Sequence, residues 1–361
     1  MPGERTARQA LIPGWDQARI HGTTAVIVGL GALGNEVAKN LALLGVGRLV
    51  LCDPDVVSSS NLSRTVLFTG DDVGRPKVEA AAAAVRRIAP GIVVDPRRAD
   101  LVRGVGIGEL ADAGVVLGCL DSRRARLQLL SRCVLGGARL VDGGTHPWGG
   151  EVRVRVDPAE GCYSCSLPAG QRASTDDPVS CAAAAERPQP SSILSTALVA
   201  AWMTVAAGRL LLGERLPWRL LSVDGLTGTT GNTAVTRDPA CPHHRPATPV
   251  ELLPVDVTAT VGQLLAVLPA GVEPVTWVLF GLPGFCYDCS RTVAAGVPAG
   301  RGVVPCPSCG QPVRMRLTQR IRDALPDVRL SELDVAPGEI LPVLEGGDTR
   351  WFRLAPNPTS F

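Results

Sequence analysis

The sequence lacks the features of several broad classes of protein. It has no dense run of lysine or arginine and a formal net charge of only +2, so a nucleic-acid partner has no electrostatic support. Its first residues, MPGERTARQA, carry charges where a signal peptide needs an apolar core. Apart from recurring C-x-x-C pairs, it has no internal repeat and no low-complexity tract. We therefore expect a cytoplasmic globular protein that engages neither nucleic acid nor membrane.

An apolar run long enough to cross a bilayer is also missing. The stretch PQPSSILSTALVAAWMTVAAG at 188–208 contains no charge, but two prolines open it and serines and threonines interrupt it. Its apolar part ends at Arg209 after about 15 residues, whereas a span needs about 20. We expect this segment to form a helix in the core or at a dimer interface.

Cysteine, by contrast, is abundant, with eleven residues in a chain expected to be cytoplasmic, where ligands or nucleophiles are commoner than disulfides. Most of them fall into short pairs that also include a histidine: Cys162/Cys165, Cys241/His244, Cys286/Cys289 and Cys306/Cys309. The first two pairs predict a closed, structural zinc site, since four N/S ligands leave no position for water. His243 is the alternative fourth ligand, although the spacing favours His244. Reduced side chains without metal are the other interpretation.

The last two cysteine pairs are separated by 16 residues and flanked by glycine and proline, as in LPGFCYDC and VVPCPSCGQP. This spacing predicts a zinc ribbon, and a domain this small gains from metal binding. A redox pair is the rival interpretation of any single C-x-x-C. The segment 249–361 has no phosphate loop and no second catalytic constellation, so we expect it to serve as a docking module.

The first 150 residues alternate between strand and helix patterns. Strands are predicted at 24–29, 48–53, 92–95, 114–120 and 138–142, and helices at 34–44, 76–89 and 122–135. This alternation predicts an α/β fold with a Rossmann-like, doubly wound parallel sheet. The later stretches EVRVRVDP and WRLLSVDGLTGTTGNTAVTRD predict an antiparallel extension. We place a domain boundary near residue 248, giving domains 1–248 and 249–361.

A nucleotide site is predicted at the first strand-to-helix turn, VIVGLGALGNE. Gly29, Gly31 and Gly34 have the spacing G-x-G-x-x-G, which brings backbone close to phosphate and points the N–H groups of residues 32–35 at the anion. Asp53, at the end of LVLCD, is placed to bind ribose hydroxyls. The motif alone is compatible with NAD, with ATP, or with a tight turn that binds nothing.

Polar residues further along favour a triphosphate. Asn61, Arg64 and Lys77 bring an amide and two cations to the mouth of the site. A triphosphate attacked at its α-phosphorus develops charge that such groups absorb, whereas a dinucleotide needs no such clamp. Asp121 follows the apolar strand VVLGCL at the carboxyl edge of the sheet, where it can hold Mg²⁺. Each residue singly fits a surface ion pair or a helix cap, but the ordered set favours ATP.

With these residues the chain resembles the ThiF/MoeB/HesA adenylating enzymes, bacterial relatives of the ubiquitin-activating enzymes. The resemblance covers about 5–246 and also includes Arg5-Thr-Ala-Arg8-Gln9, Asp53-Pro-Asp55, Ser60-Asn61-Leu62-Ser63-Arg64, Gly74-Arg75-Pro76-Lys77, Arg126, Cys133 and the first zinc site. The sequence departs from the family pattern at Thr65, Ser122 and His244, where Gln, Asn and Cys are usual. The cations and the carboxylate remain, so we expect adenylation to be retained.

The resemblance implies a role for each site residue. Asp53, with Asp55 beside it, would hold ribose, while Asn61, Arg64 and Lys77 would hold the triphosphate and Asp121 would bind Mg²⁺. Arg8 would reach into the partner subunit's site of a homodimer. The implied reaction is ATP-dependent adenylation of the C-terminal carboxylate of a small ubiquitin-fold sulfur carrier ending in Gly-Gly, with release of pyrophosphate.

Two other functions remain open at this stage. A peptide- or metabolite-adenylating enzyme of natural-product biosynthesis would use the same site with a different carboxylate. An NAD-dependent oxidoreductase would explain the glycines and Asp53, but it would leave the cations and Asp121 without a task.

Cys181 is the expected nucleophile for a transfer step. Cys52, Cys119 and Cys133 fall in apolar strands or a helix, whereas Cys181 lies in the polar segment ASTDDPVSCAAAAERPQPSS. The resembled family has a crossover loop there, often with the cysteine that receives the activated carrier. Arg187 would favour the thiolate, although Asp176 and Asp177 would oppose it. The alternatives are direct transfer to a sulfur donor and an exposed cysteine without a task.

Overall fold

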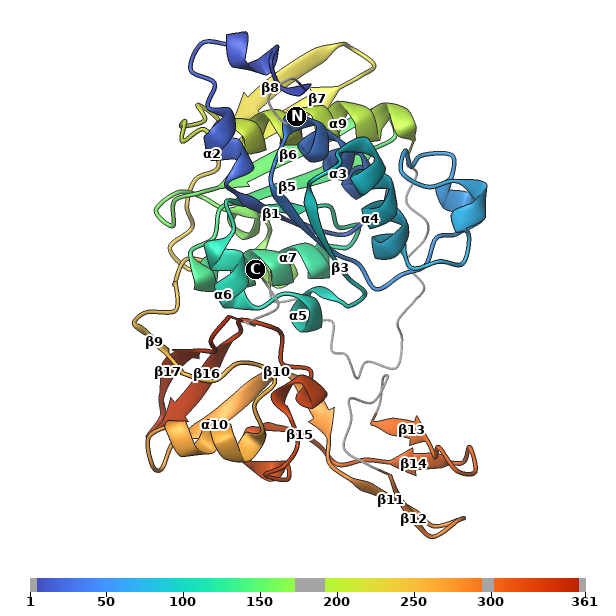
Figure 1. Cartoon of the computed structure of the whole chain (residues 1–361). Coiled ribbons are helices and arrows are strands. Elements are labelled where there is room, and N and C mark those ends of the chain that lie inside the picture. Colours follow the sequence, from blue (N-terminus) through green and yellow to red (C-terminus); the bar gives the residue numbers. More distant parts are fainter. Residues whose placement is uncertain (1–4, 173–191, 294–301, 357–361) are drawn as a thin grey trace. The chain divides into compact units, whose positions relative to one another are not determined.

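The computed structural model describes residues 5–172, 192–293 and 302–356, which divide into two compact units (Figure 1). One unit holds most of the chain up to Pro246. The other holds the residues from Ala247 onward and the short segment Val102–Glu109. This segment was not expected outside the first domain. It belongs to the second unit because the Ile107 N–H donates to the buried Glu339 carboxylate at 3.0 Å.

The first unit is built on an eight-stranded sheet with the order β3-β2-β1-β4-β5-β6-β7-β8. Strands β1 to β5 run parallel, and β5 to β8 pair antiparallel. The chain order therefore reverses between β1 and β4, which is the point where ligands bind in such sheets. The strands are β1 Thr24–Val28, β2 Arg48–Cys52, β3 Val93–Arg97, β4 Val115–Gly118, β5 Leu140–His146, β6 Gly149–Arg155, β7 Leu220–Asp224 and β8 Thr229–Thr233.

Helices cover both faces of this sheet (Figure 1). The alternation of side chains along the strands shows which helices pack on each face. Ala25, Ile27, Leu49 and Leu51 point to one face and join the core cluster of α3 (Ala32–Leu44), α4 (Lys77–Ile88) and α9 (Ile193–Leu211). Residues between them in the strands are equally buried toward the opposite face, where α7 (Arg123–Gly136) packs on β4 and β5. The remaining helices of this unit are α2 Gln17–His21, α8 Ala169–Arg172, η1 Gln9–Leu11, η2 Ser59–Asn61, η3 Gly70–Asp72 and η4 Tyr163–Ser166. Two further helices, α5 Leu101–Gly104 and α6 Ile107–Asp112, belong partly to this unit and partly to the segment of the second unit.

Helix α9 contains the uncharged stretch that imitates a membrane span. By length and composition it is the one helix, among described residues, that could cross a bilayer, and half of its most apolar window is buried inside the protein. Val199, Ala200 and Met203 belong to the core cluster of the first unit. One face of α9 is therefore a core face, as expected from the sequence.

The second unit contains a five-stranded sheet, order β15-β10-β16-β17-β9, with its own apolar core. Two further hairpins, β11–β12 and β13–β14, carry the last two cysteine pairs. Their core consists of Cys286, Val293, Cys306 and Val313. A core this small gives little hydrophobic stabilisation. The elements are β9 Val250–Leu252, α10 Val261–Val267, β10 Glu273–Gly281, β11 Gly284–Cys286, β12 Arg291–Val293, β13 Val303–Pro305, β14 Pro312–Arg314, β15 Leu317–Arg320, η5 Ile321–Asp323, η6 Leu330–Leu333, β16 Ile340–Glu345 and β17 Asp348–Arg353.

The expected Rossmann-like α/β fold with an antiparallel extension is confirmed. Each strand and helix predicted for the first 150 residues is present, with ends that move by a few residues. The strand predicted at 114–120 is one example, since β4 ends at Gly118 and leaves Asp121 in the following loop. The short helices α5 and α6 were not predicted, because four to six residues are too few to establish a helical periodicity.

The space around the glycines of the motif differs from one position to the next, so substitutions there should differ in their effect on stability. A methyl group at Gly34 would overlap the carbonyl oxygen of Gly29, whereas one at Gly31 would meet nothing within 4 Å. Gly34→Ala should therefore lower the free energy of unfolding by about 3 kcal/mol or more. Gly31→Ala should cost less than about 1 kcal/mol, the loss of a helix N-cap glycine. Urea unfolding of both variants tests this, and equal destabilisation would contradict it.

Candidate functional site

The glycine turn lies at the carboxyl edge of the sheet, between β1 and β4. Gly29 has φ +89°, and its α-carbon faces the carbonyl of Cys119 in the loop after β4. Helix α3 begins at Ala32, so the partial positive charge of a 13-residue helix is directed at this edge. Neither packing nor backbone conformation requires a glycine at Gly31, so the open space beside it fits the close approach of a phosphate.

Asp53 holds the glycine turn in place. Its carboxylate is 5% exposed; Oδ2 accepts a hydrogen bond from the Leu30 N–H at 2.6 Å, and Oδ1 accepts from Asp55 N–H at 2.8 Å. Both oxygens therefore bind backbone, which fixes the end of β2 against the turn after β1. The ribose contact expected of Asp53 would use the remaining acceptor capacity of these oxygens.

Lys77 lies beside this carboxylate at the first position of α4. Its ammonium is 2.8 Å from Asp55 Oδ2 and 3.8 Å from Asp53 Oδ1, and the residue is 8% exposed. Two carboxylates thus hold a nearly buried cation next to the glycine turn. The fold thus brings Lys77 beside Asp53 and Asp55, which lie more than 20 residues earlier in the chain.

Asn35 also positions the site, and the sequence analysis missed it. The side chain is fully buried; its Nδ2 donates to the Leu30 carbonyl at 2.9 Å, and its Oδ1 accepts from Leu67 N–H at 3.0 Å. It therefore links the glycine turn to the segment that carries Arg64. The available signal was an amide directly after the third glycine, at a position of α3 that packs inward.

Asn61 and Arg64 lie in and after the short helix η2, and both are half-buried. The Asn61 carbonyl oxygen of the side chain accepts from Ser58 N–H at 3.0 Å, while its main-chain carbonyl accepts from the Thr65 hydroxyl at 3.1 Å. Arg64 donates one hydrogen bond to Ser60 O at 2.5 Å. A guanidinium has five N–H donors, so Arg64 keeps donors for an anion.

Asp121 and Arg8 are exposed, in contrast to the buried residues around Asp53. Asp121 follows β4 by three residues, in the same loop as the Cys119 carbonyl that faces Gly29. Ser122 caps helix α7 by accepting from the Ala125 N–H at 3.2 Å, which gives this departure from the family pattern a structural role. Arg8 precedes η1, and its role in a partner's site stays a prediction.

Behind Asp121, a buried ion pair joins α7 to β5. Arg126 donates to Asp142 Oδ2 at 2.7 Å and to the Leu120 carbonyl. Burial alone would lower the pKa of Arg126, but the Asp142 carboxylate raises it, so the guanidinium stays charged. Through its bond to the Leu120 carbonyl, the pair holds the loop after β4 in place. Asp142 was missed because a single acid in a strand gives no pairing signal.

Cys119 and Cys133 are buried thiols near this pair. Burial raises the pKa of Cys119 far above its ordinary value, and burial raises that of Cys133 to about 12. Both are therefore neutral and unreactive near pH 7, as expected of packing residues. Cys181, the expected nucleophile, lies outside the described residues.

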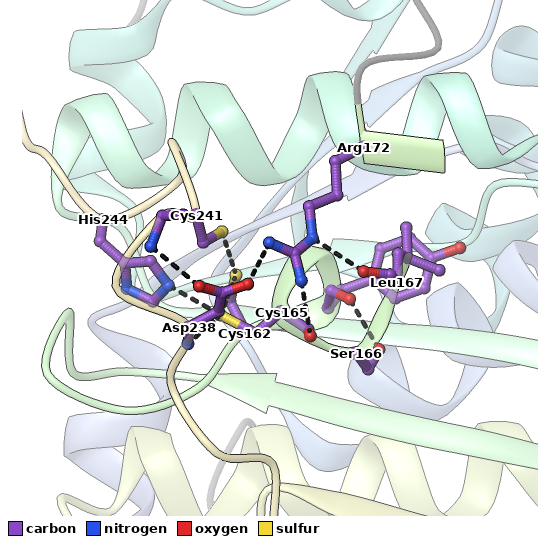
Figure 2. A network of polar contacts seen from close by, with 10 residues as sticks. Cys162, Cys165, Ser166, Leu167, Arg172, Asp238, Cys241 and His244 are labelled. Carbon is purple, nitrogen blue, oxygen red and sulfur yellow. Dashed lines mark hydrogen bonds and ion pairs between the residues drawn. The ribbon is translucent and has the colours of Figure 1, made fainter. Parts of the chain in front are cut away.

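The first predicted metal site brings together Cys162, Cys165, Cys241 and His244 (Figure 2). Cys162 Sγ lies 3.7 Å from Cys165 Sγ and 3.8 Å from Cys241 Sγ. A disulfide would need about 2.05 Å, whereas sulfurs around a tetrahedral zinc lie about 3.8 Å apart. The geometry thus fits a zinc ion held by three thiolates and one imidazole.

Contacts around this cluster orient its ligands. His244 Nδ1 is 2.8 Å from the Pro158 carbonyl, which leaves Nε2 directed at the cluster, 3.0 Å from Cys165 Sγ. A backbone carbonyl in this position is the usual partner of a metal-bound histidine. His243 is outside the cluster. Arg172 pairs with the Asp238 carboxylate, and the Asp238 N–H donates to Cys165 Sγ (Figure 2). These contacts link the segment that carries the first cysteine pair to the segment that leads to Cys241.

The pKa of Cys165 also reflects this arrangement. Burial opposes the thiolate, but hydrogen bonds from backbone N–H groups and from His244 lower the pKa to about 6. A thiolate is the form that binds metal, so its surroundings favour the metal-binding form of Cys165.

The second predicted metal site brings together Cys286, Cys289, Cys306 and Cys309 from the two hairpins of the second unit. Cys286 Sγ is 3.6 Å from Cys309 Sγ, and Cys289 Sγ is 3.6 Å from Cys306 Sγ. These are again contact distances suited to a shared metal and too long for disulfides. All four sulfurs lie within 4.8 Å of one another, which is the arrangement expected of four ligands around one metal ion.

Comparisons with known proteins agree with this arrangement. A model of the ThiF family matches residues 4–243. The SAMP-activating enzyme E1 of Haloferax volcanii is 34% identical over 238 residues, which are 63% of this chain and 82% of that protein. The molybdopterin-synthase adenylyltransferase of Escherichia coli is 38% identical over 165 residues, 45% of this chain and 66% of that protein. The sulfur carrier protein ThiS adenylyltransferase of Escherichia coli is 35% identical over 156 residues, 43% and 62% of the two chains.

Solved structures show the same fold. A crystal structure of Escherichia coli MccB with MccA-N7isoASN has a TM-score of 0.55 at 19% identity, covering 68% of this chain and 77% of that one. The family model spans more than half of the chain and confirms the resemblance drawn from the sequence. The chain therefore belongs to the ThiF family.

Proposed function

We propose that this protein adenylates the C-terminal carboxylate of a small ubiquitin-fold carrier protein with ATP. The observation that carries the proposal is the buried Lys77, paired with the buried Asp53 and the exposed Asp55, beside a glycine turn whose Gly31 leaves room for phosphate. The names of the relatives support the substrate class, since they include activating enzymes for SAMP and for sulfur carrier protein ThiS. A carrier ending in Gly-Gly is the partner we propose.

A triphosphate suits these residues better than a dinucleotide. A dinucleotide would use the glycine turn and Asp53, but it would leave Lys77 and Arg64 facing no additional charge. ATP places further phosphate oxygens where these cations lie, and Asp121 would hold the Mg²⁺ that accompanies them. Mg²⁺ supplies neutralisation of phosphate charge when it is bound.

The reaction requires positioning and charge neutralisation but no general base. A carboxylate oxygen of the carrier forms a bond to the α-phosphorus, the bond from that phosphorus to the bridging oxygen breaks, and pyrophosphate leaves with the electron pair. The attacking carboxylate is already an anion, so no proton has to be removed. Arg64, Lys77 and the N-terminus of α3 stabilise the charge that develops on the phosphate oxygens.

The second half of the reaction rests on sequence alone. We propose Cys181 as the acceptor of the activated carrier, with direct transfer to a sulfur donor as the alternative route. Adenylation of a peptide or metabolite carboxylate is the alternative first step, because the nucleotide site does not depend on which carboxylate attacks.

Both cysteine clusters are proposed to be structural zinc sites. The Cys162, Cys165, Cys241 and His244 site would tie η4 to the segment after β8, and the second would replace the core that the two hairpins lack. Four protein ligands leave neither ion a position for catalytic water.

The proposed assembly is a homodimer through the outer face of α9. Leu194, Leu198, Ala201 and Val205 are exposed along one side of that helix, at helical spacing. Trp148, 50% exposed, lies in the turn beside Leu198. A continuous apolar stripe of this kind indicates an interface.

The adenylation site is tested by ATP–pyrophosphate exchange in the presence of candidate carriers. Arg64→Ala and Asp121→Ala should each lower exchange at least about a hundredfold, the usual effect of removing one group that stabilises transition-state charge. Gly31→Ala should weaken ATP binding although it keeps the fold, since its methyl group would fill the phosphate space.

Matched controls separate these effects from a general loss of charge. Arg87 and Asp71 are exposed and lie outside the site, so Arg87→Ala and Asp71→Ala should retain exchange. Full exchange in Arg64→Ala or Asp121→Ala would remove that residue from the mechanism. Exchange driven by a peptide or metabolite, with no response to any Gly-Gly carrier, would favour the alternative substrate.

Metal analysis of the purified full chain should find about two zinc ions per chain, because each cluster has the four ligands of a closed zinc site. Cys306→Ser should release one ion and keep exchange activity, whereas Cys165→Ser should release the other and destabilise the adenylation unit. A metal-free, folded and active protein would refute both sites.

The dimer and the role of Arg8 can be tested together. Leu198→Glu should convert the dimer to a monomer in analytical ultracentrifugation, while Leu325→Glu, at an exposed leucine of the second unit, should not. If Arg8 acts across the interface, mixing inactive Arg8→Ala and Arg64→Ala chains should restore about a quarter of the sites, as random pairing in a two-fold dimer predicts. No recovery of activity in a mixture whose subunits exchange would place Arg8 in its own subunit's site, and an Arg8→Ala chain that is active by itself would place Arg8 outside any site.

A further inference from the structure

Arg172 connects the two segments that supply the ligands of the first metal site (Figure 2). It is the last residue of α8 and follows Cys165 by 7 positions, whereas its ion partner Asp238 comes shortly before Cys241. Neither Arg172 nor Asp238 belongs to the ligand cluster itself. Their pair spans 66 positions of the chain. It therefore joins two parts of the sequence that must meet before four ligands can surround one ion.

The Arg172 guanidinium is held by three groups. Nε donates to the Leu167 carbonyl at 2.8 Å and Nη2 donates to the Cys165 carbonyl at 3.2 Å. Nη1 donates to the Asp238 carboxylate, and the Arg172 side chain is 14% exposed. An ordinary surface pair contributes little, because both side chains lose freedom and solvent screens their charges. The two backbone contacts and the partial burial distinguish Arg172 from such a pair.

Asp238 transmits this restraint to the ligands. Its N–H donates to Cys165 Sγ at 3.4 Å, and its main-chain carbonyl accepts from the Cys241 N–H at 3.0 Å. Its carboxylate also accepts from the Ala240 N–H at 2.8 Å, which fixes the turn that leads to Cys241. Asp238 is therefore bonded to a ligand residue of each segment, and Arg172 holds its carboxylate in place.

Each half of the site, by contrast, is shaped by local contacts. The Cys165 N–H donates to the Cys162 carbonyl at 3.0 Å, which closes a turn within one C-x-x-C. Bonds of this short range do not join the two segments, and closing the long loop between them costs chain entropy. Groups that hold metal ligands in place from outside the ligand set affect how tightly the ion binds. The pair of Arg172 and Asp238 is a contact of this kind.

We propose that Arg172 is a positioning residue of the first metal site: it clamps the two segments together in the geometry that binds the ion and so determines how tightly zinc is held. The inference rests on the proposed zinc occupancy of this cluster. A guanidinium suits the task because its planar donors reach a carboxylate and two carbonyls at once. An ammonium or a side-chain amide has fewer donors in a different geometry.

The test is a titration of the zinc-loaded full chain with a chelator, comparing the wild type with Arg172→Gln. The variant should bind one of its ions about ten- to a hundredfold more weakly, the usual effect of removing an outer contact of a metal site, and should retain the other. The same comparison in Cys306→Ser, which should lack the second ion, assigns the weakened ion to the first site. Unchanged affinity in Arg172→Gln would overturn the proposal, whereas a wild type without zinc at the first site would overturn the occupancy itself.

Arg209→Gln is the matched control. Arg209 also pairs with a carboxylate, that of Glu214, and donates to a backbone carbonyl, but it lies in the last turn of α9 and outside both clusters. This variant should keep both ions at wild-type affinity. A loss of affinity equal to that of Arg172→Gln would overturn the specific role of Arg172.

Thermal unfolding separates positioning from general stabilisation of the fold. Arg172→Gln should lower the unfolding midpoint more in the zinc-loaded chain than in the metal-free chain, because the variant loses part of the stabilisation that bound zinc provides. An equal decrease in both forms would assign Arg172 a purely structural role and overturn the proposal.

A double-mutant cycle tests the clamp directly. Asp238→Asn removes the ion pair but keeps the N–H that bonds to Cys165, so it should weaken zinc binding through the same contact as Arg172→Gln. The combined variant should then bind zinc little more weakly than Arg172→Gln alone, and additive losses would overturn the clamp. Arg172→Lys is the milder variant if Arg172→Gln does not fold. It keeps the charge but loses the planar donors, so unchanged zinc affinity in Arg172→Lys would also contradict the proposal.

Discussion

The hydrogen bond from the Leu30 N–H to the buried Asp53 carboxylate is the contact on which the nucleotide site depends. It joins the turn after β1 to the end of β2 at 2.6 Å, in a setting that is 5% exposed. A charge-assisted bond in such surroundings is strong and is hard to replace by water. Because Lys77 is held by the same carboxylate and by Asp55, the bond also sets where the nearest cation lies. The backbone of the glycine turn and the cation beside it are therefore held in place by the protein itself.

The sequence predicted the parts of this site that short spacing encodes. The glycine motif, the acid after β2 and the order of strands and helices follow local patterns, and the fold they predicted is confirmed. Asn35 and Asp142 were missed for a physical reason. Neither has a partner within a few residues that would form a motif, so its role comes from a neighbour that only the folded chain brings near. Asn35 meets Leu67, and Asp142 meets Arg126.

The cysteine clusters could be predicted from the sequence only in part. Each half-site is a local C-x-x-C or C-x-x-H signal, so the ligands could be named from the sequence. Which halves meet depends on tertiary structure, since Cys165 and Cys241 lie far apart in the chain. A metal bond across such an interval removes more unfolded-chain freedom than one across a short loop. The hairpins of the second unit would gain from an ion for a different reason, because only four buried residues form their core.

Burial separates the site residues into two groups with different tasks. Asp53 and Asn35 are buried and bind backbone groups, and Lys77 is buried beside two carboxylates, so removing any of them should disturb the fold. Arg64 and Asp121 are half-buried or exposed, and few protein contacts restrain them. Under the proposed reaction, Arg64 and Asp121 would have to follow a phosphate as its charge shifts, and this freedom would help them do so. The buried residues would then hold the turn in place while the exposed ones adapt to the substrate.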